Sequence, residues 1–232
     1  MKEEIKNAMN EYQRKKYKIL RKAITPELAK FCYTYFLNKR KVATFLFKQG
    51  WLSPFAMEWG IWSDEQVPNT YSHYGDVVME TLLQDLRVKM EQETGYKLQE
   101  AYSYARLYKT GDVLPRHKDR YSCEVSSTLN LGGDPWSVYL EPKKNVCVPT
   151  GVFVPTKNKG IKVDLKPGDM IIYSGCEVEH WREAFLGKNC GQVFLHYNDT
   201  AKKTAKENIY DTRPFPGLPR WFKGFKFPSP KK

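Results

Sequence analysis

Two histidines and one aspartate have the types and the order needed to bind a divalent metal. His117 and Asp119 are separated by a single residue, and His180 follows in a distant part of the chain. Side chains at i and i+2 of an extended segment project to the same side, so His117 and Asp119 could reach one ion. Two imidazoles and one carboxylate on one face of Fe(II) leave the opposite face open for a cosubstrate and dioxygen. If the fold brings the three residues together, they predict an oxygenase site.

The ligand types alone leave two questions open. Histidine and carboxylate also suit Zn(II) and Mn(II), although the absence of cysteine from the triplet disfavours a structural zinc site. The chain has only four histidines, and His196 is the best rival to His180 as the third ligand. We favour a core role for His196. A His-x-Asp triplet also arises by chance in surface turns, so its meaning depends on the elements around it.

The first part of the chain is predicted to be largely helical. Thr25 followed by Pro26 is typical of an N-cap and a first helical position, and Gly50 is a plausible stop for that helix. A later segment has apolar side chains at helical spacing and ends at Gly95. The predicted helices span 3–22, 26–48 and 75–94, and residues 51–72 are predicted to be irregular or partly extended.

After residue 97 the pattern changes to a period of two, which is typical of strands. Four long polar or aromatic side chains alternate with smaller or apolar ones, and so are expected on one side of a strand: Tyr102, Tyr104, Arg106 and Tyr108. Further short strands are separated by turn residues. They are predicted at about 126–131, 137–141, 147–154, 161–164, 169–173, 177–183 and 190–197. About eight short strands indicate a sandwich or barrel.

The sequence therefore predicts a mainly β fold with flanking α-helices, in one structural domain. An N-terminal helical support region is expected over 1–96 and the catalytic core over 97–200. A basic, Pro-rich C-terminal tail, irregular in its last 22 residues and either wrapping the body or mobile, is expected over 201–232.

The composition and the charge distribution limit the cellular compartment and the binding partners that can be expected. No apolar run approaches the roughly 18 residues of a membrane span, and the charged N-terminus lacks the apolar region of a secretory signal. The five cysteines form no CxxC pair and are expected to be reduced, which favours a cytoplasmic protein. Of the net charge of +12, residues 1–22 carry +5 and residues 201–232 carry +7. Basic ends could contact nucleic acid, an acidic protein or an anionic surface, or could simply aid solubility.

Several segments resemble Fe(II)- and 2-oxoglutarate-dependent dioxygenases of the prolyl 4-hydroxylase type. They are 108–120 (YKTGDVLPRHKDR), 127–131 (STLNL), 165–173 (LKPGDMIIY) and 179–183 (EHWRE), and the likeness in order and spacing covers about 100–197. The resemblance implies a double-stranded β-helix, or jelly-roll, core with His117, Asp119 and His180 as iron ligands. It also implies 2-oxoglutarate and dioxygen as cosubstrates, with succinate and CO2 as products.

The chain departs from this family at the residue that anchors the distal carboxylate of 2-oxoglutarate. The family usually has Arg or Lys nine or ten residues after the second histidine, where this chain has Asn189 and Cys190. A buried arginine is costly without an anion, so an inward-facing arginine is a sensible replacement. The candidates, in order of preference, are Arg182, Arg106 and Lys188, and Tyr108 and Asn130 could add neutral hydrogen bonds.

The leading hypothesis is a hydroxylase of a C–H bond in a protein or peptide, with a prolyl side chain suggested by the resemblance alone. The same chemistry on a nucleobase or small metabolite is the first alternative. A non-catalytic metal-binding jelly roll or scaffold is the second, and a missing 2-oxoglutarate anchor would favour it. The sequence leaves the oligomeric state open.

Overall fold

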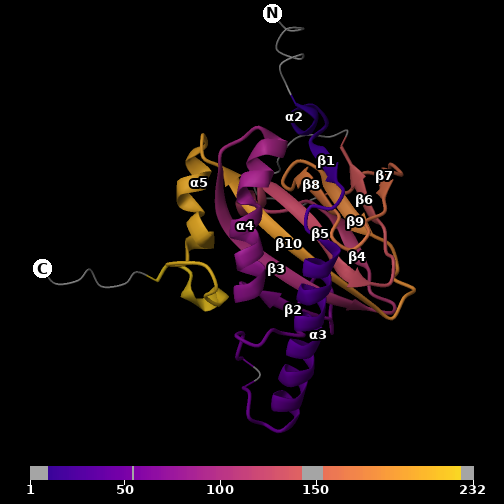
Figure 1. The fold of residues 1–232 in the computed structure, drawn as a ribbon, viewed down its shortest axis with the longest axis vertical. Coiled ribbons are helices and arrows are strands. Elements are labelled where there is room, and N and C mark those ends of the chain that lie inside the picture. The colour runs from indigo at the N-terminus through magenta and orange to yellow at the C-terminus, as the bar shows by residue number, and fades with distance from the viewer. Residues whose placement is uncertain (1–9, 54, 143–153, 226–232) are drawn as a thin grey trace, which may run out of the picture.

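The computed structural model describes residues 10–53, 55–142 and 154–225, in which the strands form two antiparallel sheets (Figure 1). The larger sheet has the order β1 (Tyr17–Leu20), β8 (Met170–Ser174), β5 (Val125–Gly133), β10 (Asn189–Asp199), β3 (Leu98–Lys109), β2 (Tyr71–Tyr74). The smaller sheet has the order β4 (Leu114–His117), β9 (Glu179–Arg182), β6 (Val138–Glu141), β7 (Ile161–Val163). The predicted mainly β fold with a jelly-roll core is confirmed.

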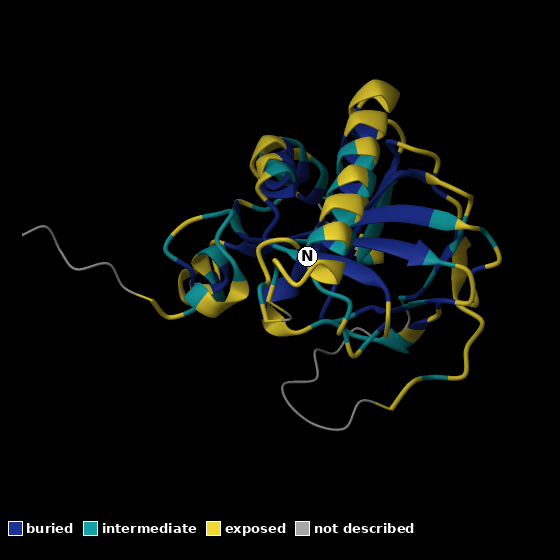
Figure 2. Ribbon diagram, turned by 90° about the horizontal axis from the view of Figure 1, so that it is seen from below, coloured by how far each residue is buried: buried dark blue, intermediate teal, exposed yellow. Residues whose placement is uncertain are grey.

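Helices cover the outer face of the larger sheet (Figure 1). The helices are α2 (Glu11–Lys15), α3 (Pro26–Lys48), α4 (Val77–Thr94) and α5 (Lys203–Glu207), with 3-10 turns at Tyr121–Cys123, Ile209–Thr212 and Arg220–Phe222. Figure 2 shows the strands coloured as buried beneath helices whose outer faces are exposed. None of the helices in the described part of the chain is both long and apolar enough to cross a membrane.

The two long helices begin and end at the residues that the sequence indicates. The Thr25 side chain accepts a hydrogen bond from the Leu28 amide at 3.2 Å, and Pro26 is the first residue of α3. Gly95 ends α4 in the left-handed conformation, with φ of 74°, which glycine adopts at little cost. The helix predictions for 26–48 and 75–94 are therefore confirmed.

Two short strands replace structure that was expected to be helical or irregular. The prediction of a helix over 3–22 is wrong for residues 17–20, which form β1 and pair with β8. Residues 71–74 form β2 and pair with β3. Most of the strand expected at 147–154 lies outside the described residues, and Val154 is not in a strand. Both new strands depend on pairing with distant segments, which local sequence does not encode.

The central strands of the larger sheet separate an apolar face from a polar one. Ala105, Leu107 and Leu195 face the helices and belong to the main hydrophobic core. Successive strand residues point to opposite faces, so the intervening side chains face the smaller sheet. They are Tyr102, Tyr104, Arg106 and Tyr108 of β3, Ser126, Thr128 and Asn130 of β5, and Cys190, Gln192, Phe194 and His196 of β10. The polar face supplies the interior of the jelly roll with groups that can bind ligands.

The segment after β10 packs onto the body of the protein. Arg213 forms a salt bridge of 2.8 Å with Glu80 of α4, and both side chains are buried. Asp211 accepts two hydrogen bonds from Arg120, at 2.9 and 2.7 Å. Residues 211–225 therefore wrap the body, and residues 226–232 lie outside the described part of the chain.

The cysteines are not all reduced, which corrects the expectation from the sequence. Cys32, Cys123 and Cys190 are free and buried. Cys176 is disulfide-bonded. Cys147 lies outside the described residues.

A buried carboxylate joins α3, β2 and α4. Asp76 caps α4 by accepting from the Val78 and Met79 amides, and it also contacts Lys39 at 2.5 Å and His73 at 3.0 Å. His73 is a buried residue of β2. Burial alone would raise the pKa of Asp76, but His73 and Lys39 outweigh burial and hold that pKa well below its usual value.

We expect Asp76→Asn to lower the free energy of unfolding by about 2 kcal/mol at pH 7, because the amide can keep the cap but loses its charged partners. A carboxylate with a lowered folded-state pKa stabilises above its unfolded pKa of about 3.9, and this contribution is lost as the pH falls further. The difference from wild type should therefore shrink below about pH 4 in urea unfolding curves. Asp85→Asn, at an exposed position of α4, is the control and should change little.

Candidate metal centre

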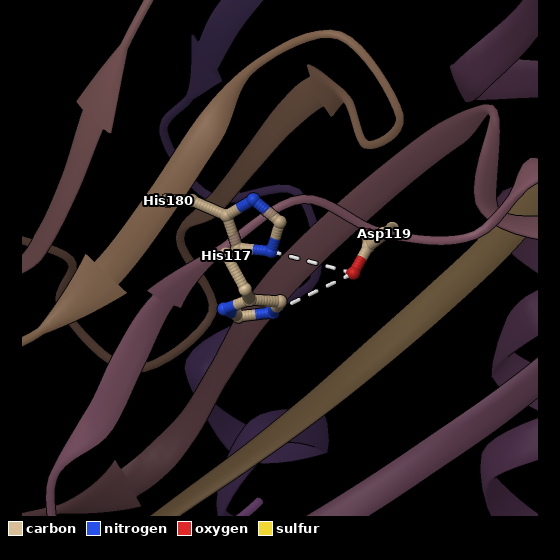
Figure 3. Close-up of side chains that lie close together, drawn as sticks. All are labelled: His117, Asp119 and His180. Atoms are coloured by element: carbon tan, nitrogen blue, oxygen red, sulfur yellow. Dashed lines mark ion pairs between the residues drawn. The ribbon is translucent and has the colours of Figure 1, made fainter. Parts of the chain in front are cut away.

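Neighbouring strands of the smaller sheet bring the two candidate histidines side by side. His117 ends β4 and is paired in register with His180 of β9. Asp119 lies just past the end of β4, where its backbone N–H donates to the Gly175 carbonyl at 2.8 Å. The structure thus brings together the three residues that the sequence proposed as ligands (Figure 3).

The three side chains converge on one point. The Nε2 atoms of His117 and His180 lie 3.6 Å and 3.4 Å from the same Asp119 oxygen, Oδ1. The two imidazole rings are 4.1 Å apart between centroids, tilted by 55°. The ligand atoms of all three residues lie within 4.8 Å of one another, a spacing that a single ion can bridge.

Backbone carbonyls fix which ring nitrogen of each histidine faces that point. The Nδ1 atom of His117 contacts the Pro115 carbonyl at 2.7 Å, and that of His180 contacts the Val178 carbonyl at 3.0 Å. A carbonyl accepts only from a protonated nitrogen, so Nδ1 carries the hydrogen and Nε2 keeps its lone pair. Metal-binding histidines are commonly oriented in this way.

The protonation states also suit a cation. Burial, followed by the neighbouring His180, lowers the pKa of His117, which keeps the ring neutral at pH 7. Burial alone would raise the pKa of Asp119, but the two histidines outweigh burial and hold that pKa well below its usual range. The neutral ring of His117 and the ionised carboxylate of Asp119 are therefore ready to bind, and a set of two histidines and one aspartate fits Fe(II) as well as Mn(II) or Zn(II).

Two residues that the sequence did not single out support Asp119. The Ser126 hydroxyl donates to Asp119 Oδ2 at 2.9 Å and also contacts the Cys123 carbonyl and His196 Nδ1. A Cβ atom on Gly175 would lie 2.5 Å from Asp119 Oδ2 and 2.2 Å from the Cys123 carbonyl oxygen, so only glycine fits there. Each role depends on tertiary contacts; only the position of Gly175 in a Ser-Gly turn between β8 and β9 was a local signal.

We expect Ser126→Ala to raise the dissociation constant for a divalent metal about tenfold, because the loss of a hydrogen bond that orients a ligand costs roughly 10- to 100-fold in affinity. Competition with a chromophoric chelator would measure the change. Ser127→Ala is the matched control, since Ser127 is also buried but its hydroxyl has a single hydrogen bond within the described part of the chain, to the Leu195 carbonyl at 3.5 Å. Equal affinities for the two variants would contradict the role given to Ser126.

The triad opens into a cavity of about 660 Å³ between the sheets. Tyr102, Tyr104 and Phe194 form an aromatic wall on the larger sheet. Residues from the segment 57–66 and Arg220 of the C-terminal segment also line the cavity. The volume of the cavity is within the range of typical small-molecule pockets, so the site has room for a cosubstrate and a side chain of a substrate.

Arg106 lines this cavity but already has an acidic partner. Its guanidinium lies 2.5 Å from Asp64, and donates to the Tyr108 hydroxyl at 3.0 Å and to the Gln66 side chain at 3.1 Å. Burial would raise the pKa of Asp64, but Arg106 and Tyr104 hold it below its usual value. The charge of Arg106 is thus balanced within the protein.

Arg182 lies deeper between the sheets and has no acidic partner among the described residues. Its guanidinium donates to the Trp136 carbonyl at 2.5 Å and to the Gln192 side chain at 3.3 Å. Its Nε atom is buried and has no hydrogen-bond partner, and the side chain is only 1% exposed. Arg182 is not among the residues that line the cavity. It is a buried cation that still lacks an anion.

The remaining candidate anchors differ in how they are engaged. Lys188 is exposed, in a turn where its backbone N–H donates to Asp134. The Asn130 amide is occupied by the Leu165 carbonyl, the Gly132 amide and Gln192. Tyr108 is buried beside Arg106, and burial raises the pKa of its hydroxyl, which stays neutral.

Solved structures with known activities share this fold. A prolyl 4-hydroxylase of Pseudomonas putida superposes with a TM-score of 0.55 at 14% identity, covering 81% of this chain and 95% of that chain. The non-heme α-ketoglutarate-dependent epimerase SnoN of nogalamycin biosynthesis gives 0.58 at 14%, covering 81% and 80%. A prolyl hydroxylase of Trichoplax adhaerens, in complex with a hypoxia inducible factor oxygen degradation domain peptide, gives 0.54 at 14%, covering 88% and 93%.

No family model and no curated protein sequence matches the chain. The sequence identity between this chain and the three structures above is at most 14%, so the likeness shows a common fold and nothing more specific. The expected likeness to 2-oxoglutarate-dependent oxygenases of the prolyl hydroxylase type is confirmed at that level.

Proposed function

We propose that the protein is an Fe(II)- and 2-oxoglutarate-dependent dioxygenase that hydroxylates a C–H bond of a peptidyl, prolyl-type substrate. The observation that carries this proposal is the convergence of His117, Asp119 and His180 on one point inside a jelly-roll cavity. Bound Fe(II) would supply the oxidation of a C–H bond by dioxygen, coupled to conversion of 2-oxoglutarate to succinate and CO2. The protein's own residues would hold the metal and the cosubstrate and exclude water from the reacting atoms.

Arg182 is proposed as the anchor for the distal carboxylate of 2-oxoglutarate. It follows His180 by two residues on β9, which corresponds to roughly 6.6 Å along a strand and suits a five-carbon dicarboxylate bound to the metal at its other end. A buried guanidinium without an anion is costly, and a carboxylate would complete its bonding through the free Nε. Cys190, at a position where the family usually has a cation, is small and faces the same interior as Gln192.

The other candidates are proposed in supporting roles. Arg106 is the second choice of anchor, because binding a cosubstrate there would have to displace Asp64. Tyr108 would offer its neutral hydroxyl near both arginines, and Asn130 would orient Gln192. The exposed Lys188 is the least favoured.

The shape of the cavity supports a side chain of a peptide as the substrate. The aromatic wall of Tyr102, Tyr104 and Phe194 faces the metal triad and would pack against an apolar ring. A prolyl hydroxylase with the same fold has been solved with a peptide bound. A small metabolite is the alternative, supported by the epimerase among the similar structures. The basic segment 201–232 keeps nucleic acid as a third possibility.

Succinate release tests the proposal directly. The protein with Fe(II), ascorbate and 2-oxoglutarate should release succinate slowly, and the rate should rise with a substrate. Proline-containing peptides, single-stranded oligonucleotides and small metabolites would be compared, with mass spectrometry to detect the added oxygen. Folded, iron-loaded protein that yields no succinate under any of these conditions would overturn the enzyme proposal in favour of a non-catalytic metal-binding protein.

A further inference from the structure

A second group of potential metal ligands lies directly beside the first and shares one residue with it. Ligand atoms of Asp119, Cys123 and His196 all lie within 4.8 Å of one another. All three side chains line the same cavity of about 660 Å³, so an ion entering it can reach them. Cys123 ends the short 3-10 turn after Asp119, and His196 comes from β10.

The two oxygens of Asp119 face different groups. Oδ1 is the atom near both His117 and His180 (Figure 3). Oδ2 accepts the hydrogen bond of Ser126, which also contacts His196. A single carboxylate is thus presented to two sets of ligands, one on each side.

Hydrogen bonds orient the other two side chains of the second group. Ser126 lies 2.9 Å from Nδ1 of His196, which leaves Nε2 as the nitrogen that can bind a cation. The Tyr102 hydroxyl lies 3.0 Å from Cys123 Sγ and can donate to the sulfur. Contacts of this kind fix the orientation of metal ligands.

The second group differs from the first in chemistry. It offers sulfur, nitrogen and oxygen, a set that favours thiophilic or borderline ions such as Zn(II) and Co(II). Burial raises the pKa of the Cys123 thiol to about 12. A cation that binds the sulfur displaces that proton into solvent, because a metal-coordinated thiol is deprotonated.

We propose that Asp119, Cys123 and His196 form a second cation site that takes a thiophilic divalent ion and competes with the His117–Asp119–His180 site for Asp119. Ions bridged by one carboxylate lie roughly 3.5–4 Å apart. Here only one carboxylate and one thiolate would be present to offset the repulsion between the two cations. The two sites are therefore filled one at a time. Zinc in the second site would therefore displace iron from the first.

Anaerobic titration of the metal-free protein with Co(II) tests the site without any assay of activity. Wild type is expected to develop the near-ultraviolet thiolate-to-cobalt charge-transfer band. Cys123→Ala should lose this band. Cys32→Ala should keep it, because Cys32 is also a buried free thiol but belongs to α3, outside the second group of ligands. The double variant His117→Ala, His180→Ala should also keep the band, since it leaves the second group intact.

The outcomes separate this proposal from a simpler role of the same residues. If Cys123 and His196 only support Asp119 through hydrogen bonds, cobalt will bind with a nitrogen and oxygen spectrum and no thiolate band, which overturns the proposal. Competition gives the second readout: the Zn(II) concentration that displaces half of the bound Fe(II) should rise about tenfold in Cys123→Ala. No rise, or two ions bound at once in wild type, would overturn the competition. Neither measurement depends on 2-oxoglutarate turnover.

Discussion

Asp119→Asn is expected to abolish Fe(II) binding at micromolar metal and to lower the rate of succinate release by roughly 10³-fold or more. The carboxylate is the only anion in the triad, and both histidines point at its Oδ1 atom. An amide of nearly the same size offers a neutral oxygen and a wrongly placed N–H donor. Metal content by mass spectrometry and succinate by chromatography would check the two effects.

The controls for this prediction also test the choice of the third ligand. Asp85→Asn, the same substitution at an exposed position, should leave both readouts unchanged. His180→Ala should lose iron, whereas His196→Ala should retain most of it. Iron retained in His180→Ala but lost in His196→Ala would show that the wrong histidine has been assigned.

Arg182→Met is expected to raise the KM for 2-oxoglutarate about 10²-fold, equivalent to about 3 kcal/mol, with a smaller change in kcat. Methionine keeps much of the apolar volume of the side chain while removing the charge and the donors. The analogue 2-oxopentanoate has no distal carboxylate, so the substitution should cause little increase in its KM. Wild type and variant should therefore use this analogue about equally poorly.

The same measurement on the other cations decides between the candidate anchors. Lys188→Met should leave the KM within about twofold, because Lys188 is exposed. Arg106→Met should raise it less than Arg182→Met, since Arg106 is neutralised by Asp64. The reverse order would place the anchor at Arg106 and make Asp64 a group that the cosubstrate must displace.

Short-range sequence signals correctly predict the features that depend on neighbouring residues, such as helix caps and the alternation of side chains along a strand. Thr25 and Pro26 mark the start of α3, and Gly95 marks the end of α4, because capping and left-handed turns depend on residue type. The alternation in β3 correctly separates the side chains that face the helices from those that face the smaller sheet. The spacing of His117 and Asp119 likewise predicted that these two side chains lie together.

Contacts between distant segments could not be predicted in this way. β1 is a run of four residues that becomes a strand only by pairing with β8, whose residues lie 150 to 156 positions further along the chain. The partner of Arg106 is Asp64, from the segment expected to be irregular or partly extended and more than 40 positions earlier in the chain. Ser126 and Gly175 support Asp119 from β5 and from the turn after β8, and both roles depend on contacts between distant segments.

Both outermost strands of the larger sheet, β1 and β2, come from the chain before residue 97, whereas the candidate metal ligands all come after it. A fragment containing only 97–200 would leave β8 and β3 as edge strands, each still paired on one side, with β5 and β10 respectively, but without a neighbour on the other. Bare edges of this kind invite pairing between molecules, so such a fragment should aggregate rather than fold. The half of the chain that carries the metal ligands therefore cannot be separated from the N-terminal segment. Any engineered protein that takes over this site must also include residues 17–20 and 71–74.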